Sequence, residues 1–137
     1  LAAVPFRLRA ETVEVALKGE YLISPENLEP QTIQAIDSAY QGSGLNPFSR
    51  PELNAPPGPF QQRLDQIKWA KFGIYDLSAP DRVQSILELG AALALGKEVI
   101  LICRKGSLLP EAVRHLERIE YEGPSDLTEK LRKKIRF

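Results

Sequence analysis

From Lys18 onward, short apolar runs alternate with segments of helical periodicity, and this alternation strongly limits the folds the chain can adopt. Strands are predicted at 21–23, 71–78, 98–103 and 116–123, with a further short strand at 45–48. Helices are predicted at 28–40, 61–70, 82–95, 110–115 and from Ser125 onward. Because such spacing builds parallel sheets through right-handed crossovers, we predict a three-layer α/β/α sandwich with about five parallel strands.

Several residues predict where these elements end. Gly42 and Gly96 follow helical segments and are typical of C-terminal caps, while Ser125 is a typical N-cap. The segment 44–60 holds five of the eleven prolines and predicts a long loop. Residues 18–137 then form one α/β domain, and 1–17, with the alternating "TVEVAL", form an extension or an added edge strand. The sequence has no methionine, so we expect it to belong to a longer chain.

Composition excludes several classes of protein. With 18 Lys and Arg against 18 Asp and Glu, the formal net charge is zero, which argues against a nucleic-acid partner. No apolar run approaches the roughly 20 residues that cross a bilayer, and no signal-peptide pattern opens the chain, so we expect no membrane association. The single cysteine, Cys103, rules out an internal disulfide and fits a reducing compartment. We therefore expect a soluble, cytoplasmic protein.

Candidate site residues follow the strands, because open parallel sheets bind ligands beyond the carboxyl ends of their strands. The first strand is followed by Ser24, Glu26 and Asn27, and the third by Asp76, Ser78 and Asp81. His115 is the only histidine, so serine-histidine-acid catalysis is improbable and a multi-histidine metal site is excluded. Nothing in the sequence demands a metal ion or a cofactor, and we predict neither. Carboxylates remain as the groups that could carry chemistry.

Glu88 lies in the most apolar stretch, "ILELGAALALGKEVILI", and allows two interpretations. Its neighbours three and four positions away on the helix form a polar-to-small stripe: Gln84, Ser85, Ala91 and Ala92. Helical periodicity alone favours a solvent-facing glutamate, because charged residues on helices usually face water. Small neighbours also suit a crevice wall, where a ligand approaches closely, so a catalytic glutamate is the competing interpretation.

The block "AKFGIYDLSAPDRVQSILELGAALALGKEVILI", 70–102, resembles the nucleoside 2-deoxyribosyltransferase-like group, which is related in fold to Toll/interleukin-1 receptor (TIR) domains. Members of that group commonly show a strand that ends in aspartate, a helix with Glu-Leu-Gly, and Ala-Leu-Gly-Lys before the next strand. The resemblance extends more weakly through "YLISPEN" and "QRLDQIKWA". It implies a flavodoxin-like or TIR-like topology.

What the resemblance implies is chemistry at an N-glycosidic bond of a nucleoside, a nucleotide or NAD. Glu88 would attack the anomeric carbon and form a glycosyl-enzyme ester, as a carboxylate nucleophile can do opposite an oxocarbenium-like transition state. Asp76 would orient the substrate or handle the leaving-group proton. The remaining substrate-binding residues would be Ser24, Glu26, Asn27, Ser78 and Asp81.

Two alternatives stay open. The transferases usually place an aspartate six residues before the glutamate, whereas this chain has Arg82 there. The chain could therefore be a non-catalytic nucleotide-binding sensor or a protein-interaction module of a larger protein. It could also form homo-oligomers through a surface that contains Ala91, Ala92 and Leu95.

Overall fold

The computed structural model describes residues 19–48, 59–78 and 82–135. Five parallel strands form one sheet in the order β2-β1-β3-β4-β5. They are β1 (Gly19–Ser24), β2 (Leu45–Pro47), β3 (Phe72–Asp76), β4 (Glu98–Arg104) and β5 (Ile119–Tyr121). The helices are α2 (Pro30–Tyr40), α3 (Pro59–Trp69), α4 (Arg82–Ala94), α5 (Glu111–Arg114) and α6 (Pro124–Ile135).

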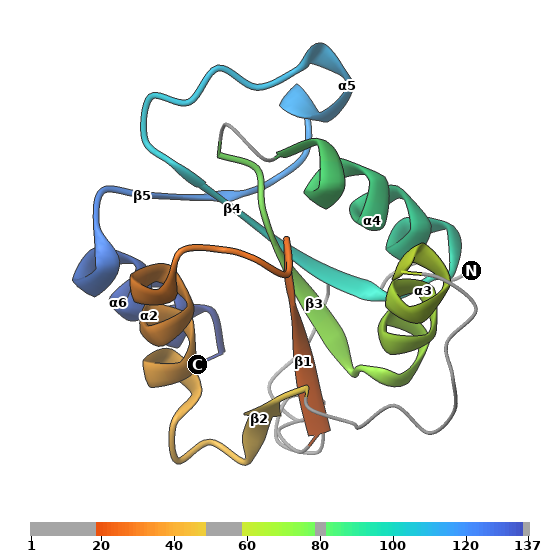
Figure 1. The fold of residues 1–137 in the computed structure, drawn as a ribbon. Coiled ribbons are helices and arrows are strands. Elements are labelled where there is room, and N and C mark those ends of the chain that lie inside the picture. The colour runs from red at the N-terminus through yellow and green to blue at the C-terminus, as the bar shows by residue number, and fades with distance from the viewer. Residues whose placement is uncertain (1–18, 49–58, 79–81, 136–137) are drawn as a thin grey trace.

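The helices cover both faces of the sheet, so the predicted three-layer sandwich is confirmed (Figure 1). Helices α2 and α6 pack on one face, and α3 and α4 lie on the other. The strand order is the flavodoxin-like one, in which the chain winds outward in both directions from its first strands. All carboxyl ends of the strands therefore meet at one edge of the sheet.

Alternation along the strands divides the core into two clusters, because successive side chains point to opposite faces. Tyr21 and Ile74 belong to the cluster under α2 and α6. Leu22 and Tyr75 belong to the cluster under α3 and α4. Strand β3 is buried along its whole length, as expected for a central strand with helices on both faces. Cys103 is also buried, which agrees with its predicted place in a strand.

The structure corrects the predicted start of the last helix. Helix α6 begins at Pro124, so Ser125 lies inside its first turn and is not the N-cap. Proline suits the first helical position, because the N–H that it lacks would have no partner there. The Asp126 side chain accepts the N–H of Glu122 at 2.8 Å, and the N–H of Leu127 reaches the Gly123 carbonyl at 2.9 Å. The predicted extension at 1–17, with "TVEVAL", lies outside the described residues.

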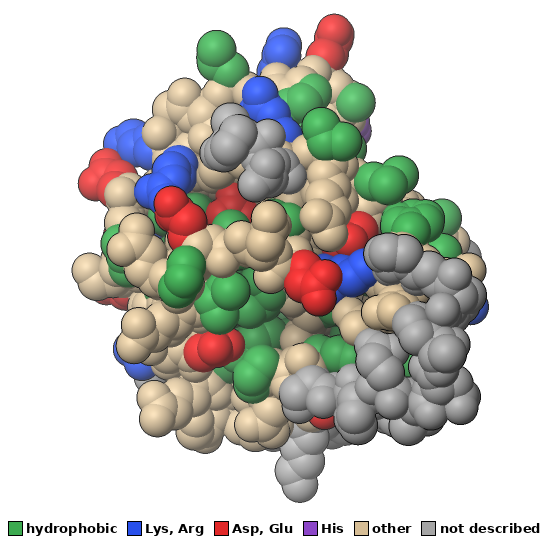
Figure 2. Space-filling view, viewed as in Figure 1, with side chains coloured by type: hydrophobic (Ala, Val, Ile, Leu, Met, Phe, Trp, Pro, Cys, Tyr) green, Lys and Arg blue, Asp and Glu red, His purple; other side chains and the backbone are tan. Residues whose placement is uncertain are grey.

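Helix α4 leaves apolar side chains on the surface. Figure 2 shows hydrophobic side chains gathered over this helix, where Val83 is 77% and Leu87 56% exposed. Ala92, by contrast, is fully buried in the core, so its predicted place in a subunit contact is wrong. Homo-oligomer formation itself stays a prediction. Among the described residues, no helix is long and apolar enough to span a membrane.

Candidate active site

Glu88 is buried, and the interpretation of it as a solvent-facing residue is therefore wrong. Its side chain is 1% exposed, and it lies on the face of α4 that packs against the sheet. Ser85 and Ala92, on the same helical stripe, are also fully buried. The stripe of polar and small residues is thus an inner face, where short side chains let the helix approach the strands closely.

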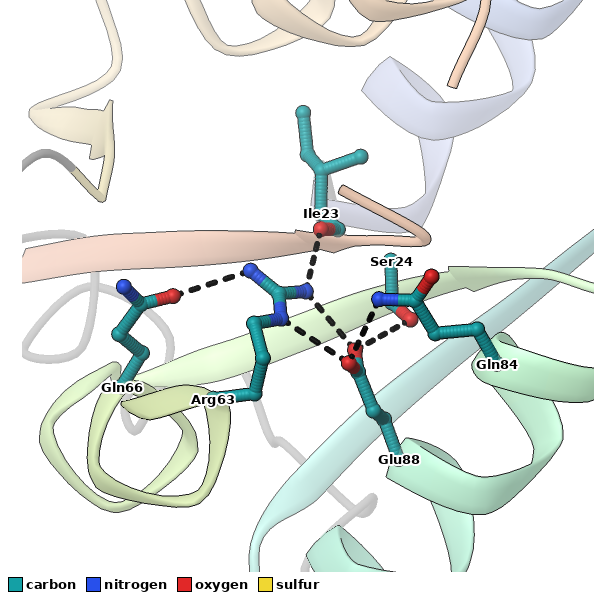
Figure 3. A network of polar contacts seen from close by, with 6 residues as sticks. All are labelled: Ile23, Ser24, Arg63, Gln66, Gln84 and Glu88. Carbon is teal, nitrogen blue, oxygen red and sulfur yellow. Dashed lines mark hydrogen bonds and ion pairs between the residues drawn. The ribbon is translucent and has the colours of Figure 1, made fainter. Parts of the chain in front are cut away.

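Four hydrogen bonds hold the Glu88 carboxylate (Figure 3). Oε1 accepts the hydroxyl of Ser24 at 2.7 Å and Nη2 of Arg63 at 2.8 Å. Oε2 accepts Nε of Arg63 at 3.0 Å and Nε2 of Gln84 at 3.0 Å. The donors come from β1, α3 and α4, so the site forms only when these three elements pack together. Arg63 binds both oxygens, which is the strong two-point geometry of an arginine–carboxylate pair.

Arg63 is itself fixed on several sides. It is 7% exposed, Nη2 also donates to the Ile23 carbonyl at 3.0 Å, and Nη1 donates to Oε1 of Gln66 at 3.0 Å. In Figure 3 the guanidinium lies between Gln66 and Glu88, below the end of β1. A planar group held at all three nitrogens has little freedom to turn, so it fixes the direction of the carboxylate.

The surroundings keep Glu88 ionised. Burial by itself raises the pKa of this carboxyl, because a charge is poorly solvated in the interior. Hydrogen bonds from Arg63, Gln84 and Ser24, together with the positive charge of Arg63, outweigh burial and lower the pKa below its ordinary value. A buried carboxylate that stays negative at neutral pH is what a nucleophile requires, and equally what a structural ion pair requires.

Sequence reasoning missed Arg63, although a signal for it exists. In "QQRLDQIKWA", Arg63 stands four residues before Ile67 and seven before Ala70, and both of these are buried in the core. Residues at such spacing share one helical face, so an arginine there points inward. A buried arginine needs an anion, and this requirement predicts a carboxylate partner elsewhere in the chain.

Tyr75 adds a buried aromatic wall next to the ion pair. Its pKa is raised first by burial and then by the negative charge of Glu88, with Arg63 acting in the opposite direction. The ring folds back over Gly73, where a Cβ would lie 2.6 Å from the Tyr75 ring. The glycine in "KFGIYD" therefore leaves the room that this tyrosine occupies beside the site.

Asp76 lies outside this network. It follows Ile74 by two residues in β3, so it points to the α2 and α6 face, whereas Ser24 shares the α3 and α4 face with Leu22. Oδ2 accepts the Tyr121 hydroxyl at 2.8 Å and Oδ1 accepts the Ser78 N–H at 2.7 Å. The two predicted catalytic carboxylates thus lie on opposite faces near the same edge of the sheet.

The other predicted site residues are spread along this edge. Ser78 is half-buried, and its hydroxyl accepts the N–H of Arg104 at 2.8 Å. Glu26 and Asn27 are exposed in the turn after β1. Asp81 lies outside the described residues. Of the predicted binding residues that the structure describes, Ser24 is the one that hydrogen-bonds to Glu88.

Two surface hollows lined by described residues lie away from the Glu88 carboxylate. A surface hollow of about 780 Å³ lies between β5 and α6, and another of about 260 Å³ lies beside β4 and β5. Neither is lined by Ser24, Arg63, Gln84 or Glu88. Over 19–48, 59–78 and 82–135, no group of three or more His, Cys, Asp or Glu side chains could hold a metal ion.

Comparison with known proteins identifies the fold. No protein-family model matches the chain, and no curated protein matches it either. Among solved structures, the chain is similar to the CMP N-glycosidase BcmB of Clostridium botulinum, with a TM-score of 0.67 and 19% sequence identity. The match covers 82% of this chain and 96% of that enzyme. The chain therefore has the nucleoside 2-deoxyribosyltransferase-like fold, which it shares with a nucleotide N-glycosidase.

Proposed function

We propose that this chain cleaves or transfers the N-glycosidic bond of a nucleoside, a nucleotide or NAD, with Glu88 as the nucleophile. One observation carries the proposal: an ionised glutamate is buried at 1% exposure and held by donors from three elements, two of which begin or end near the carboxyl edge of the sheet. Ligands bind at this edge in parallel α/β folds. The similar fold of a CMP N-glycosidase supports a nucleotide as the substrate class.

In the proposed reaction, one oxygen of Glu88 forms a bond to the anomeric carbon while the carbon–nitrogen bond to the base breaks. The bonding electron pair leaves with the base nitrogen; the base of a nucleoside or nucleotide then takes a proton from the solvent, whereas the nicotinamide of NAD leaves as a neutral molecule. Water attacks the glycosyl ester in a second step and regenerates the carboxylate; a second base in place of water gives transfer. Arg63 acts as a positioning residue, because it keeps the Glu88 carboxylate negatively charged and holds its orientation.

Asp76 is proposed as a substrate-orienting residue. Among the described residues, each of its oxygens accepts one hydrogen bond, and a carboxylate oxygen can accept two, so each can also accept a hydroxyl of the ligand. Burial and then the Asp76 charge raise the pKa of Tyr121, which keeps its hydroxyl protonated and donating. Ser24, Glu26, Asn27, Ser78 and Asp81 complete the proposed substrate-binding set.

The proposal is tested by chromatographic detection of free base after incubation with NAD, ribonucleosides, deoxyribonucleosides and their monophosphates. Glu88→Gln is expected to lower the rate of base release by at least about a thousandfold, because the nucleophile is removed. Glu129→Gln is the matched control, since Glu129 is exposed on α6 and belongs to no part of the proposed site, and it is expected to keep the parent rate. Equal base release by the parent and Glu88→Gln would exclude Glu88 as the nucleophile.

The glutamine variant needs a companion, because it leaves the Arg63 charge beside a neutral amide. Glu88→Asp keeps the negative charge but withdraws the carboxylate by one methylene. We expect it to fold and to lose most of the activity, because a displacement of about 1 Å costs on the order of a hundredfold in rate. Circular dichroism on each variant separates lost chemistry from lost fold.

A second candidate function is a non-catalytic nucleotide-binding sensor or interaction module. The observation that favours it is that both oxygens of Glu88 already have two donors each, as in a purely structural ion pair. This function predicts that a nucleotide raises the melting temperature of the protein while no base is released. Detection of released base would exclude it.

A further inference from the structure

The Glu88 carboxylate has no vacant acceptor position in this structure. A carboxylate offers about four lone-pair directions in its plane, two on each oxygen. Ser24 and Arg63 occupy Oε1, and Arg63 and Gln84 occupy Oε2. If Glu88 attacks an anomeric carbon, as proposed above, one of these four donors must leave first.

The donors differ in how readily each can leave. Arg63 is charged, buried, and tied to the Ile23 carbonyl and to Gln66 as well as to Glu88. Ser24 is 0% exposed at the end of β1. Gln84 is a neutral amide, and its side chain is only half-buried. Hydrogen bonds between a neutral donor and a carboxylate are weaker than those of a guanidinium, so the Gln84 bond breaks most easily.

Gln84 also occupies the right place. It lies one helical turn before Glu88 in α4, on the side that begins at the carboxyl edge of the sheet, where ligands enter such folds. Of the four hydrogen bonds to Glu88, only that of Gln84 comes from a side chain that reaches the surface. In Figure 3 the Gln84 amide points toward the Glu88 carboxylate, where it donates to Oε2.

We propose that Gln84 is the donor that the substrate displaces, and that its amide then contacts the sugar carbon next to the anomeric carbon. A 2′-hydroxyl can donate to the amide oxygen and accept from the amide nitrogen, whereas a 2′-deoxy carbon can do neither. Gln84 is therefore a specificity-determining residue that selects ribosides over 2′-deoxyribosides. This inference rests on the proposed N-glycosidic function.

The experiment compares CMP with dCMP as probes for the parent protein, Gln84→Met and Gln66→Met. Methionine keeps the length and apolar stem of glutamine but neither donates nor accepts through an amide. Gln66 is the matched control, because it is also half-buried and belongs to the same network but contacts Arg63 instead of Glu88. Base release gives kcat/KM for each nucleotide.

We expect the parent to prefer CMP by roughly two- to tenfold, the size of one lost neutral hydrogen bond. Gln84→Met is expected to bring the ratio of kcat/KM for CMP to kcat/KM for dCMP close to one. It does so by lowering kcat/KM for CMP, while kcat/KM for dCMP stays unchanged or rises. Gln66→Met is expected to keep the parent ratio. A parent ratio retained in Gln84→Met overturns the assignment.

A second measurement does not depend on turnover. In a ¹⁵N spectrum of the protein, the Gln84 side-chain amide is assigned by its loss in Gln84→Met. Saturating CMP is expected to shift this signal, and saturating dCMP to shift it less. If CMP shifts other signals but leaves the Gln84 amide unchanged, this inference fails while the proposed function survives. If CMP and dCMP neither bind nor react, the proposed function fails for these nucleotides and the inference falls with it.

Discussion

Glu88 and Asp76 are two buried carboxylates near one edge of one sheet, and their surroundings differ. Glu88 receives the Arg63 guanidinium on both oxygens, whereas Asp76 receives a backbone N–H and a phenol hydroxyl. Within the described ranges, Arg63 is the one buried cation, and it pairs with Glu88. The comparison teaches that burial alone does not define a candidate nucleophile; the fixed ion pair distinguishes Glu88 from a second carboxylate of equal burial.

The largest expected effect on stability is that of Arg63→Met. It removes the cation and leaves the Glu88 charge without an ionic partner in the interior, which typically costs about 3–5 kcal/mol of the free energy of unfolding. Urea unfolding measures this loss. Arg104→Met is the control, because the Arg104–Glu29 pair is largely exposed and such pairs contribute at most about 1 kcal/mol. Equal losses of unfolding free energy in the two variants would mean that the buried pair contributes no more to stability than the exposed pair.

Acid should separate the parent from Glu88→Gln. Because the pKa of Glu88 in the folded protein lies below its ordinary value, the unfolded chain takes up the proton first as the pH falls. The stabilisation is present above the unfolded pKa and is lost as the pH falls through the folded pKa. In that window the parent is expected to lose stability more steeply than Glu88→Gln, by at most about 1.4 kcal/mol per pH unit. Urea unfolding at a series of pH values measures this difference. The same pH dependence of the unfolding free energy in the parent and in Glu88→Gln would contradict this.

A further effect on stability concerns Tyr121, the neutral side-chain donor to Asp76. Tyr121→Phe removes the hydroxyl that Asp76 accepts and is expected to cost about 1–3 kcal/mol of the free energy of unfolding. Tyr40→Phe is the matched control: its hydroxyl is buried and, within the described part of the chain, has no hydrogen-bond partner. Removing that hydroxyl is expected to be neutral or slightly stabilising. Thermal and urea unfolding compare the two variants, and equal costs would refute the role of the Tyr121 hydrogen bond.

Much of the fold could be predicted because its signals are local. The strand at β3 and the helix at α4 both lie where apolar runs and helical periodicity place them, and Gly96 follows α4 with φ 73°, as a C-terminal cap requires. The prediction of Ser125 as the N-cap is wrong by two positions, because Pro124 already occupies the first position of α6. Local signals fix the existence of an element better than its ends.

The candidate site was predictable only in part. The rule that ligands bind beyond the carboxyl ends of strands pointed to Ser24 and to Glu88, which the structure joins at 2.7 Å. The same rule grouped Asp76 with them, and alternation along β3 places it on the other face. Arg63 was missed because its partner lies 25 residues away, and only the packing of α3 against α4 brings the two together.

By itself, the sequence determined the class of fold and the order of strands and helices along the chain, because apolar periodicity and strand ends are properties of neighbouring residues. Glu88 became the candidate nucleophile through the resemblance of its motif to the nucleoside 2-deoxyribosyltransferase-like group, whereas helical periodicity alone favoured a solvent-facing residue. The tertiary structure decided which way the stripe of small residues on α4 faces and which cation meets Glu88. Periodicity defines the faces of a helix but not what covers them. A charge can remain in the interior only where packing delivers its partner, and here that partner is Arg63.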